Sequence, residues 1–297
     1  MIARVFFKLV LTGVLISWAG PPAINAQADP DSRSWNQPVE PFRIIGNIYY
    51  VGANEITSFL ITTPQGHIVL DGGFAETAPQ IEANIQKLGF HLSDVKVLLN
   101  SHAHLDHAGG LAELKGATQA KLVASEGDAP LLEHGGQGDF FFKSRLTFPS
   151  VKPDRLLHDG ETVSLGGTTL TAHLTPGHTK GCTSWTMNVE EAGRSRAVVF
   201  VCSVTVLPGY RLFGNTSYPQ IAQDYAQTFR TLAALPCDVF LASHGSFFNL
   251  EEKREALKGS GANNPFIDPQ SFRDFVKRFE ARFDAELKRQ RETPPKD

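Results

Sequence analysis

The chain has 297 residues, of which 41% are hydrophobic and 20% are charged, an ordinary composition for a globular protein. Its formal net charge is -3. This charge argues against a nucleic-acid partner, because such proteins usually show a basic patch or a high isoelectric point.

The N-terminal 28 residues have the order of charge and hydropathy of a secretory signal peptide. Arg4 and Lys8 precede an apolar run over residues 9–19, which Pro21 and Pro22 interrupt before a stretch of small residues. The run is shorter than the ~20 residues that cross a bilayer. We therefore expect cleavage near residue 28, although a membrane anchor or a buried helix is an alternative.

Residues 29–297 are then expected to form a single exported domain in the periplasm. Loss of two cations and no anion would change the net charge from -3 to -5. No other segment is long and apolar enough to cross a membrane, so we expect no membrane partner after cleavage. We expect a monomer.

The first half of the mature chain is predicted to contain short strands and one helix. In the helix, Thr77 can cap the N-terminus, Pro79 suits the first turn and Gly89 ends it. The predicted elements are strands at residues 44–51, 57–62, 67–70 and 95–99, and the helix at 77–89.

The second half has the same pattern of elements, in which strands precede helices. The predicted elements are a hairpin at 163–174, strands at 197–201 and 239–242, a helix at 219–235 and a C-terminal helix from 268. Phe272, Phe275, Phe279 and Phe283 share one side of this last helix. Such an order predicts sheets packed together with helices outside them.

A loop at residues 134–148 differs from its surroundings. Its glycines favour mobility, whereas three consecutive phenylalanines, Phe140 to Phe142, favour an apolar wall or lid. We expect this loop to lie at the edge of a site.

The strongest signal for chemistry is the segment 101–110, SHAHLDHAGG. His102, His104, Asp106 and His107 are four potential metal ligands that directly follow a predicted buried strand. Two residues apart in an extended segment, His102 and His104 point the same way and can bind one ion together. Imidazole and carboxylate groups suit zinc. The alternative is a polar surface loop that is rich in histidine.

Two further histidines lie in turns that follow predicted strands. His178 ends the sequence TPGH, and His244 lies in SHG directly after the strand at 239–242. Taken alone, each would be an ordinary loop histidine. Taken with the first segment, both are candidate ligands.

The pattern SHAHLDH, TPGHTKGCTSW and ASHG resembles the metallo-β-lactamase superfamily from about Phe42 to Phe283. The resemblance implies an α/β (α+β) fold, a four-layer αββα sandwich, with two Zn²⁺ ions per chain at one edge. It implies one zinc on His102, His104 and His178, and the other on Asp106, His107 and His244. It also implies that Asp71 orients a ligand histidine.

Within the superfamily the chain resembles subclass B3. Thiol hydrolases and many lactonases carry an Asp that bridges both metals after a strand that matches 197–203, where this chain has Cys202 and Ser203. Two other subclasses use a Cys as a metal ligand at that place, and Cys202 keeps this alternative open. The subclass B3 pattern matches GCTSW and residues 202–210. It implies that Ser203 and Thr205 bind a substrate carboxylate and that Tyr210 lies near the attacked carbonyl.

The implied activity is hydrolysis of the amide bond of β-lactams (penicillins, cephalosporins and carbapenems) by a zinc-bound hydroxide, which Asp106 orients, and with it β-lactam resistance. A small β-lactam is thus the expected partner. One alternative is another hydrolase of this fold that acts on lactones or thioesters. The other is a secreted zinc-binding protein without catalysis. Ser203, Thr205 and Tyr210 would then be ordinary strand-end, loop and packed aromatic residues.

The cysteine count is odd, so at least one of Cys182, Cys202 and Cys237 stays unpaired or forms an intermolecular bond. If one bridge forms, we favour Cys182–Cys202, because both residues lie near strand edges beside the proposed site.

Overall fold

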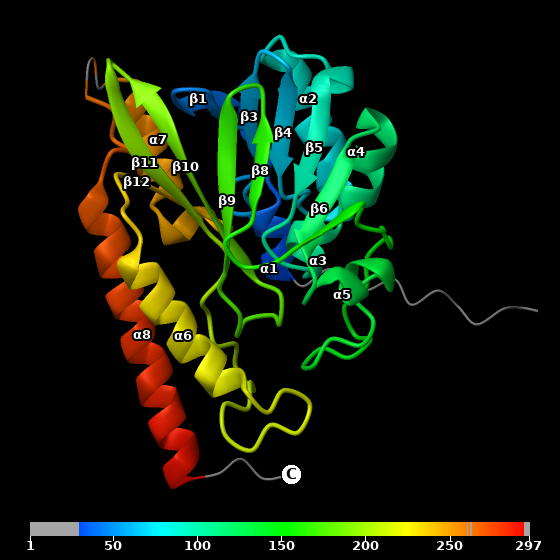
Figure 1. The fold of residues 1–297 in the computed structure, drawn as a ribbon, viewed down its shortest axis with the longest axis vertical. Coiled ribbons are helices and arrows are strands. Elements are labelled where there is room, and N and C mark those ends of the chain that lie inside the picture. The colour runs from blue at the N-terminus through cyan, green and yellow to red at the C-terminus, as the bar shows by residue number, and fades with distance from the viewer. Residues whose placement is uncertain (1–29, 260, 262, 294–297) are drawn as a thin grey trace, which may run out of the picture.

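The structure is a computed structural model that describes residues 30–259, 261 and 263–293 (Figure 1). The predicted signal peptide at residues 1–28 lies outside the described residues. Within them, no helix is both long and apolar enough to cross a membrane.

The first sheet has seven strands in sequence order. The strands β1 to β4 are antiparallel, and β4 to β7 are parallel. Their bounds are β1 Phe42–Ile45, β2 Ile48–Tyr50, β3 Phe59–Thr63, β4 Gly66–Leu70, β5 Val95–Leu99, β6 Lys121–Ser125 and β7 Arg155–Leu157.

One predicted strand is wrong in its length. Residues 44–51 were expected to be continuous, but the chain turns at Gly46 and forms the antiparallel pair β1 and β2. Gly46 has a φ of 51°, and a Cβ there would lie 2.9 Å from Val189 Cβ. The turn therefore needs glycine both for its backbone conformation and for its close approach to the second sheet.

The second sheet has five strands in the order β12-β11-β10-β9-β8. The predicted hairpin is confirmed as β8 and β9, which pair around Gly166 and Gly167, both at positive φ. The strand β11 pairs in parallel with β12 and so aligns their carboxyl ends. The bounds are β8 Thr162–Leu165, β9 Thr168–Leu174, β10 Thr183–Glu191, β11 Arg194–Val201 and β12 Val239–Ala242.

Three long helices were predicted and are present, slightly shorter than expected at some ends. They are α2 Ala78–Lys87, α6 Ile221–Ala234 and α8 Pro269–Glu292. The Asp268 carboxylate accepts a hydrogen bond from Ser271 N and so caps α8. The shorter helices are α1 Pro30–Trp35, α3 Leu105–Ala108, α4 Leu111–Thr118, α5 Ala129–Glu133 and α7 Leu250–Leu257.

The two sheets face each other, and helices cover both outer faces (Figure 1). Between the sheets, Phe59 of β3 meets Phe200 of β11 with ring centroids 5.2 Å apart. On the outer face of the second sheet, Phe240 of β12 packs on Phe275 of α8 at 4.8 Å. Helices α2 and α4 cover a second buried cluster on the first sheet. The predicted four-layer αββα sandwich is therefore confirmed.

The candidate ligands lie where strands of both sheets end. The segment 100–107 follows β5, His244 follows β12, and His178 lies in the turn between β9 and β10. Since these ends meet at one edge of the sandwich, the fold brings together residues that are more than 100 positions apart in the chain.

Candidate metal centre

The first ligand segment folds tightly against a neighbouring loop. After β5, the chain passes through His102, reaches His104 in extended conformation and turns into the short helix α3. A Cβ at Gly110 would lie 2.2 Å from Gly72 O, and one at Gly109 would lie 2.7 Å from Ala75 N. The predicted close backbone approach at these glycines is thus present, and it fixes the position of the segment.

All six predicted ligands come together. Potential ligand atoms of His102, His104 and His178 lie within 4.8 Å of one another, as do those of His102, Asp106 and His107. His107 Nε2 lies 3.1 Å from Asp106 Oδ2 and 3.3 Å from His244 Nε2. The two groups share His102 and therefore form one continuous cluster.

Asp71, which the resemblance implies would orient a ligand histidine, lies behind His107. Its Oδ1 accepts hydrogen bonds from Ser101 N at 2.7 Å and from Asn100 Nδ2 at 3.1 Å. Its Oδ2 lies 3.7 Å from His107 Nδ1. Asp71 itself is buried and has a φ of 66°. The carboxylate therefore faces the ring nitrogen of His107 that is turned away from the cluster.

His178 is held from behind by the backbone of residue 205. Its Nδ1 lies 2.9 Å from the Thr205 carbonyl oxygen. Because a carbonyl only accepts, Nδ1 carries the proton and Nε2 offers a lone pair to the cluster. The Tyr210 hydroxyl donates to the His178 carbonyl oxygen at 2.9 Å, and Ser203 Oγ lies 3.0 Å from Thr205 Oγ1.

The three predicted substrate-binding residues therefore surround His178. Ser203 and Tyr210 are each only 1% exposed, and burial raises the pKa of Tyr210 well above its ordinary value. Thr205 Oγ1 also lies 3.1 Å from His178 Nδ1. Their polar groups already have partners within the protein, and their contacts with a substrate remain a prediction.

Asp128 is a residue that the sequence analysis missed. It is 1% exposed and accepts hydrogen bonds from Ala103 N at 2.9 Å, Thr179 Oγ1 at 2.8 Å and Gly181 N at 2.8 Å. These donors belong to the loops of His102 and His178. One carboxylate thus joins the ligand loops of the two sheets. Its local sequence, Gly-Asp-Ala, looks like that of an ordinary turn.

Glu55 was also missed, and it lies behind His244. Its Oε1 is 3.4 Å from His244 Nδ1, and its carboxylate accepts hydrogen bonds from Ser246 N and Ser246 Oγ. Burial alone would raise the pKa of Glu55, but its contacts with His244 and Ser246 lower it. No local pattern distinguishes Glu55, because its partner is 189 positions away in the chain.

The loop at 134–148 packs beside the cluster. The rings of Phe140 and Phe141 lie 5.0 and 4.7 Å from the Tyr210 ring, and Phe142 lies 5.3 Å from the His104 ring. The expected apolar wall is therefore present. The mobility that was expected from the glycines remains a prediction.

A sequence profile described as the metallo-β-lactamase superfamily matches residues 51–244. The chain belongs to this superfamily. The match spans the first and the last of the six clustered ligands, and the superfamily implies a metal ion, typically zinc.

Solved β-lactamases are similar to the chain over nearly their whole length. Native FEZ-1 metallo-β-lactamase from Legionella gormanii is 44% identical, over 86% of this chain and 98% of that one, with a TM-score of 0.84. BJP-1, a subclass B3 metallo-β-lactamase of Bradyrhizobium japonicum, is 45% identical, over 88% and 98%, with a TM-score of 0.82. The predicted resemblance to subclass B3 is thereby confirmed.

Curated relatives include other hydrolases. N-acyl homoserine lactonase AttM of Agrobacterium fabrum is 32% identical over 41% of this chain and 56% of its own length. Hydroxyacylglutathione hydrolase GloC of Haemophilus influenzae is 28% identical over 69% of this chain and 88% of its own length. The chain spans about half the length of the first of these relatives, so their substrates do not transfer directly.

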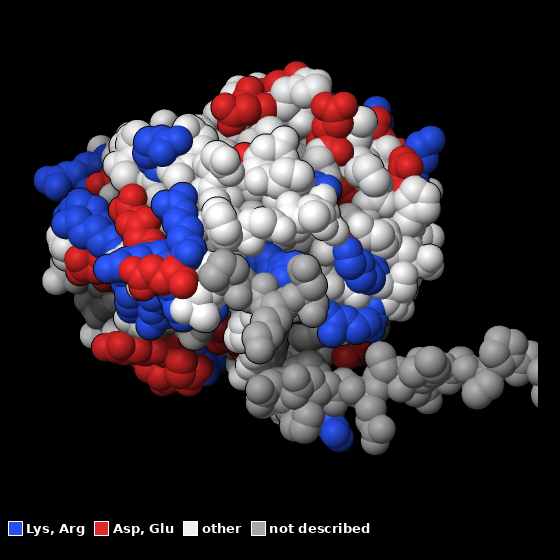
Figure 2. Space-filling view, turned by 90° about the horizontal axis from the view of Figure 1, so that it is seen from below, with Lys and Arg blue, Asp and Glu red and all other residues white. Residues whose placement is uncertain are grey.

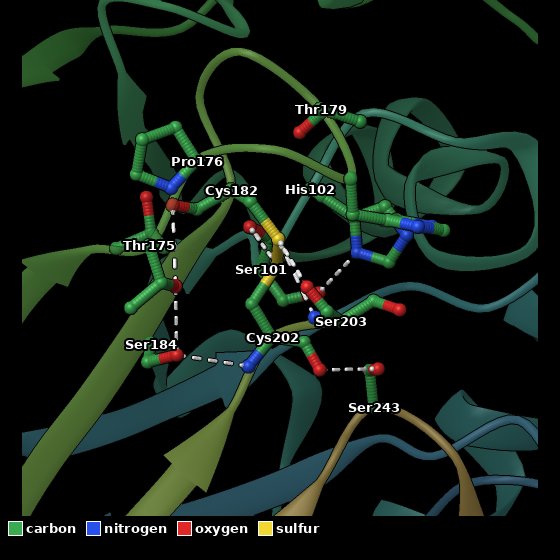
Figure 3. Close-up of a disulfide and its surroundings, with 12 residues drawn as sticks. Ser101, His102, Thr175, Pro176, Thr179, Cys182, Ser184, Cys202, Ser203 and Ser243 are labelled. Carbon is green, nitrogen blue, oxygen red and sulfur yellow. Dashed lines mark hydrogen bonds between the residues drawn. A yellow bond between two sulfur atoms is a disulfide. The ribbon is translucent and has the colours of Figure 1, made fainter. Parts of the chain in front are cut away.

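A disulfide lies beside the ligand cluster. Cys182 and Cys202 form the predicted bridge, and Cys237 is free. Figure 3 shows the bridge beside Ser101 and His102, and its sulfurs lie within 4.8 Å of a His102 ring nitrogen. Because the Cys202 sulfur is bonded to Cys182, it is not a free thiolate. The cysteine-ligand alternative is therefore excluded in this structure.

The cluster fits a divalent metal ion. Burial, together with the neighbouring histidines, holds the pKa of His102 and of His178 well below the ordinary value, so both rings are neutral and offer lone pairs. Burial alone would raise the pKa of Asp106, but His107 and His244 lower it well below the ordinary range. His102 Nε2 is buried without a hydrogen-bond partner. A metal ion would satisfy this nitrogen.

Proposed function

We propose that the protein is a zinc-dependent β-lactamase of subclass B3 that hydrolyses the amide bond of penicillins, cephalosporins and carbapenems. One observation carries this proposal. The clustered ligands lie in a chain that is 45% identical to BJP-1 over 88% of its length. On the face shown in Figure 2, basic and acidic side chains are interspersed over the left part of the described surface. This pattern differs from the continuous basic patch that is typical of proteins that bind nucleic acid.

We propose that six residues hold two Zn²⁺ ions. His102, His104 and His178 would hold one ion, and Asp106, His107 and His244 would hold the other. Zinc, when bound, supplies Lewis acidity and lowers the pKa of water to roughly 7. The protein fixes the ligands from behind through Asp71, Glu55 and the Thr205 carbonyl.

The chain's own groups would orient the reactants. Asp106 stays ionised, so it can accept a hydrogen bond from the attacking water and direct its lone pair toward the lactam carbonyl. The rings of Phe141 and Phe142 provide an apolar wall beside His104 and Tyr210. Ser203 and Thr205 hydroxyls are proposed to meet the substrate carboxylate, with Tyr210 near the carbonyl.

The match to AttM and GloC favours one second candidate, a lactonase or thioesterase. The Cys182–Cys202 bridge argues against it, because the disulfide occupies the end of β11, where such hydrolases are expected to carry an acidic metal ligand. We therefore rank β-lactams first.

A panel of substrates tests the proposal. Purified, zinc-loaded protein is assayed with nitrocefin, imipenem, an N-acyl homoserine lactone and S-lactoylglutathione. We expect turnover of nitrocefin and imipenem with little hydrolysis of the other two. Preferred hydrolysis of the lactone or thioester would reassign the substrate, and inactivity on all four in zinc-loaded protein would favour a zinc-binding protein without catalysis.

We also propose export to the periplasm and a role in β-lactam resistance. The charge and hydropathy of residues 1–28 and the disulfide both support export, because disulfides persist in oxidising compartments. Mass measurement of the periplasmic protein should give a chain that begins near residue 29. Expression in a susceptible bacterium should raise the inhibitory concentration of ampicillin, whereas a variant without residues 1–28 should not.

A further inference from the structure

Asp139 is a buried carboxylate with one oxygen that has no hydrogen-bond partner. The residue is 3% exposed. Its Oδ1 accepts hydrogen bonds from Phe141 N at 2.8 Å and Phe142 N at 2.5 Å, which fixes the carboxylate to the aromatic loop. Its Oδ2 is buried without a hydrogen bond and lies 3.8 Å from His104 Nε2, which also has none. Two unpartnered buried atoms of complementary chemistry therefore face each other.

The carboxylate approaches His104 from outside the ligand cluster. Among the described residues, Asp139 belongs to none of the groups of ligand atoms that lie within 4.8 Å of one another. The other histidines follow one rule. His107, His178 and His244 each turn one ring nitrogen to the cluster and the other to an oxygen acceptor. Asp139 is in the place of that acceptor for His104.

We propose that Asp139 is a positioning residue that accepts the Nε2–H of His104 and so couples the metal centre to the aromatic loop at 134–148. With the proton on Nε2, Nδ1 of His104 is left as the ligand atom. Since the same carboxylate holds Phe141 N and Phe142 N, the orientation of His104 and the conformation of the loop depend on each other. The proposal rests on the zinc site of the proposed function, but not on its substrate.

The first test measures zinc affinity by competition with a chromogenic chelator. Asp139→Asn keeps an oxygen for the loop amides but places an NH₂ group toward His104 Nε2, which disfavours the required tautomer. We expect zinc binding to weaken about tenfold to 100-fold, the usual cost of losing such a partner. Asp159→Asn is the control, because Asp159 accepts from Leu174 N on an exposed loop. Unchanged affinity in Asp139→Asn would overturn the proposal.

A double-mutant cycle tests whether Asp139 acts through His104. In a His104→Ala background, we expect Asp139→Asn to have no further effect on zinc affinity. A full additional loss in that background would overturn the proposed route. Circular dichroism on each variant separates loss of zinc binding from loss of folding.

The coupling to the loop has its own readout. Lys143 and Arg145 are exposed trypsin sites beside Phe142. We expect zinc to slow cleavage at these sites in the wild-type protein and to have no such effect in Asp139→Asn. An equal effect of zinc on both proteins, or none on the wild type, would overturn the coupling. No β-lactam is present in these assays, so inactivity toward β-lactams would leave their outcome intact.

Discussion

The two sheets contribute to the metal centre in different ways. The first sheet supplies four ligands within six residues, His102 to His107, on one segment after β5. The second sheet supplies His178 and His244 from separate loops, 66 positions apart in the chain. Local backbone geometry sets the first group, whereas packing between the sheets sets the second.

Hydrogen bonds and ion pairs between the loops hold the ligands of the second sheet in place. Asp128 joins the backbone of Ala103 to the loop of His178, and Glu55 reaches from the first sheet to His244. Neither Asp128 nor Glu55 is one of the six clustered ligands. Substitutions of such residues should therefore change how His178 and His244 are placed, and with that zinc binding or stability, although these residues bind no metal.

The largest effect should come from the contiguous segment. His102→Ala removes the residue shared by both groups of ligand atoms. We expect kcat/KM for nitrocefin to fall by at least about 1,000-fold, or about 4 kcal/mol. His244→Ala leaves the three-histidine group intact and should retain more zinc in mass measurements. Equal losses in the two variants would contradict the ranking, and His134→Ala, on an exposed helix end, is the control.

The next largest effect is expected on stability, at Asp128, which joins the ligand loops of the two sheets. Asp128→Asn turns an NH₂ group toward one of the three buried donors, and we expect the free energy of unfolding to fall by about 2 kcal/mol. Chemical denaturation of the metal-free protein measures this loss. Asp159→Asn should change stability little. If the two variants were equally stable, Asp128 would not join the loops as described.

Asp71 and Glu55, which lie behind the ligands His107 and His244, should affect zinc affinity to different degrees. Asp71→Asn is expected to weaken zinc binding about tenfold, because it replaces the carboxylate that faces His107. Glu55→Gln should cost less, because the Glu55 side chain is 19% exposed and the Asp71 side chain only 3%. Chelator competition on both variants tests the order. A larger loss of zinc affinity in Glu55→Gln than in Asp71→Asn would contradict the claim that burial strengthens these contacts.

The smallest effect is expected at Tyr210. Tyr210→Phe removes one hydrogen bond to the His178 carbonyl and should lower the free energy of unfolding by about 1 kcal/mol. Denaturation and nitrocefin kinetics are measured on the same sample. A fall in kcat/KM without any change in stability would assign the hydroxyl to the substrate instead of to His178.

Much of the fold could be predicted because its signals are local. The hairpin at Gly166 and the helix that begins at Pro269 follow from turn chemistry and periodicity. The predicted strand at 44–51 was wrong because a local signal was overlooked: the Gly46-Asn47 pair forms the two-residue turn between β1 and β2.

The ligands could be predicted from their spacing, but their supports could not. The His102 segment forms one motif, and the resemblance extended it to His178 and His244. Asp128, Asp139 and Glu55 were missed because each acts on a partner distant in sequence. Only folding brings these carboxylates to the histidines.

Zinc titration of the metal-free protein tests the central claim most directly. The protein is stripped with a chelator, zinc is returned stepwise, and native mass and nitrocefin hydrolysis are followed together. We expect activity to vanish on stripping and to return as the mass rises to two Zn²⁺ per chain. Hydrolysis that persists in the metal-free protein, or a chain that binds no zinc, would contradict the account.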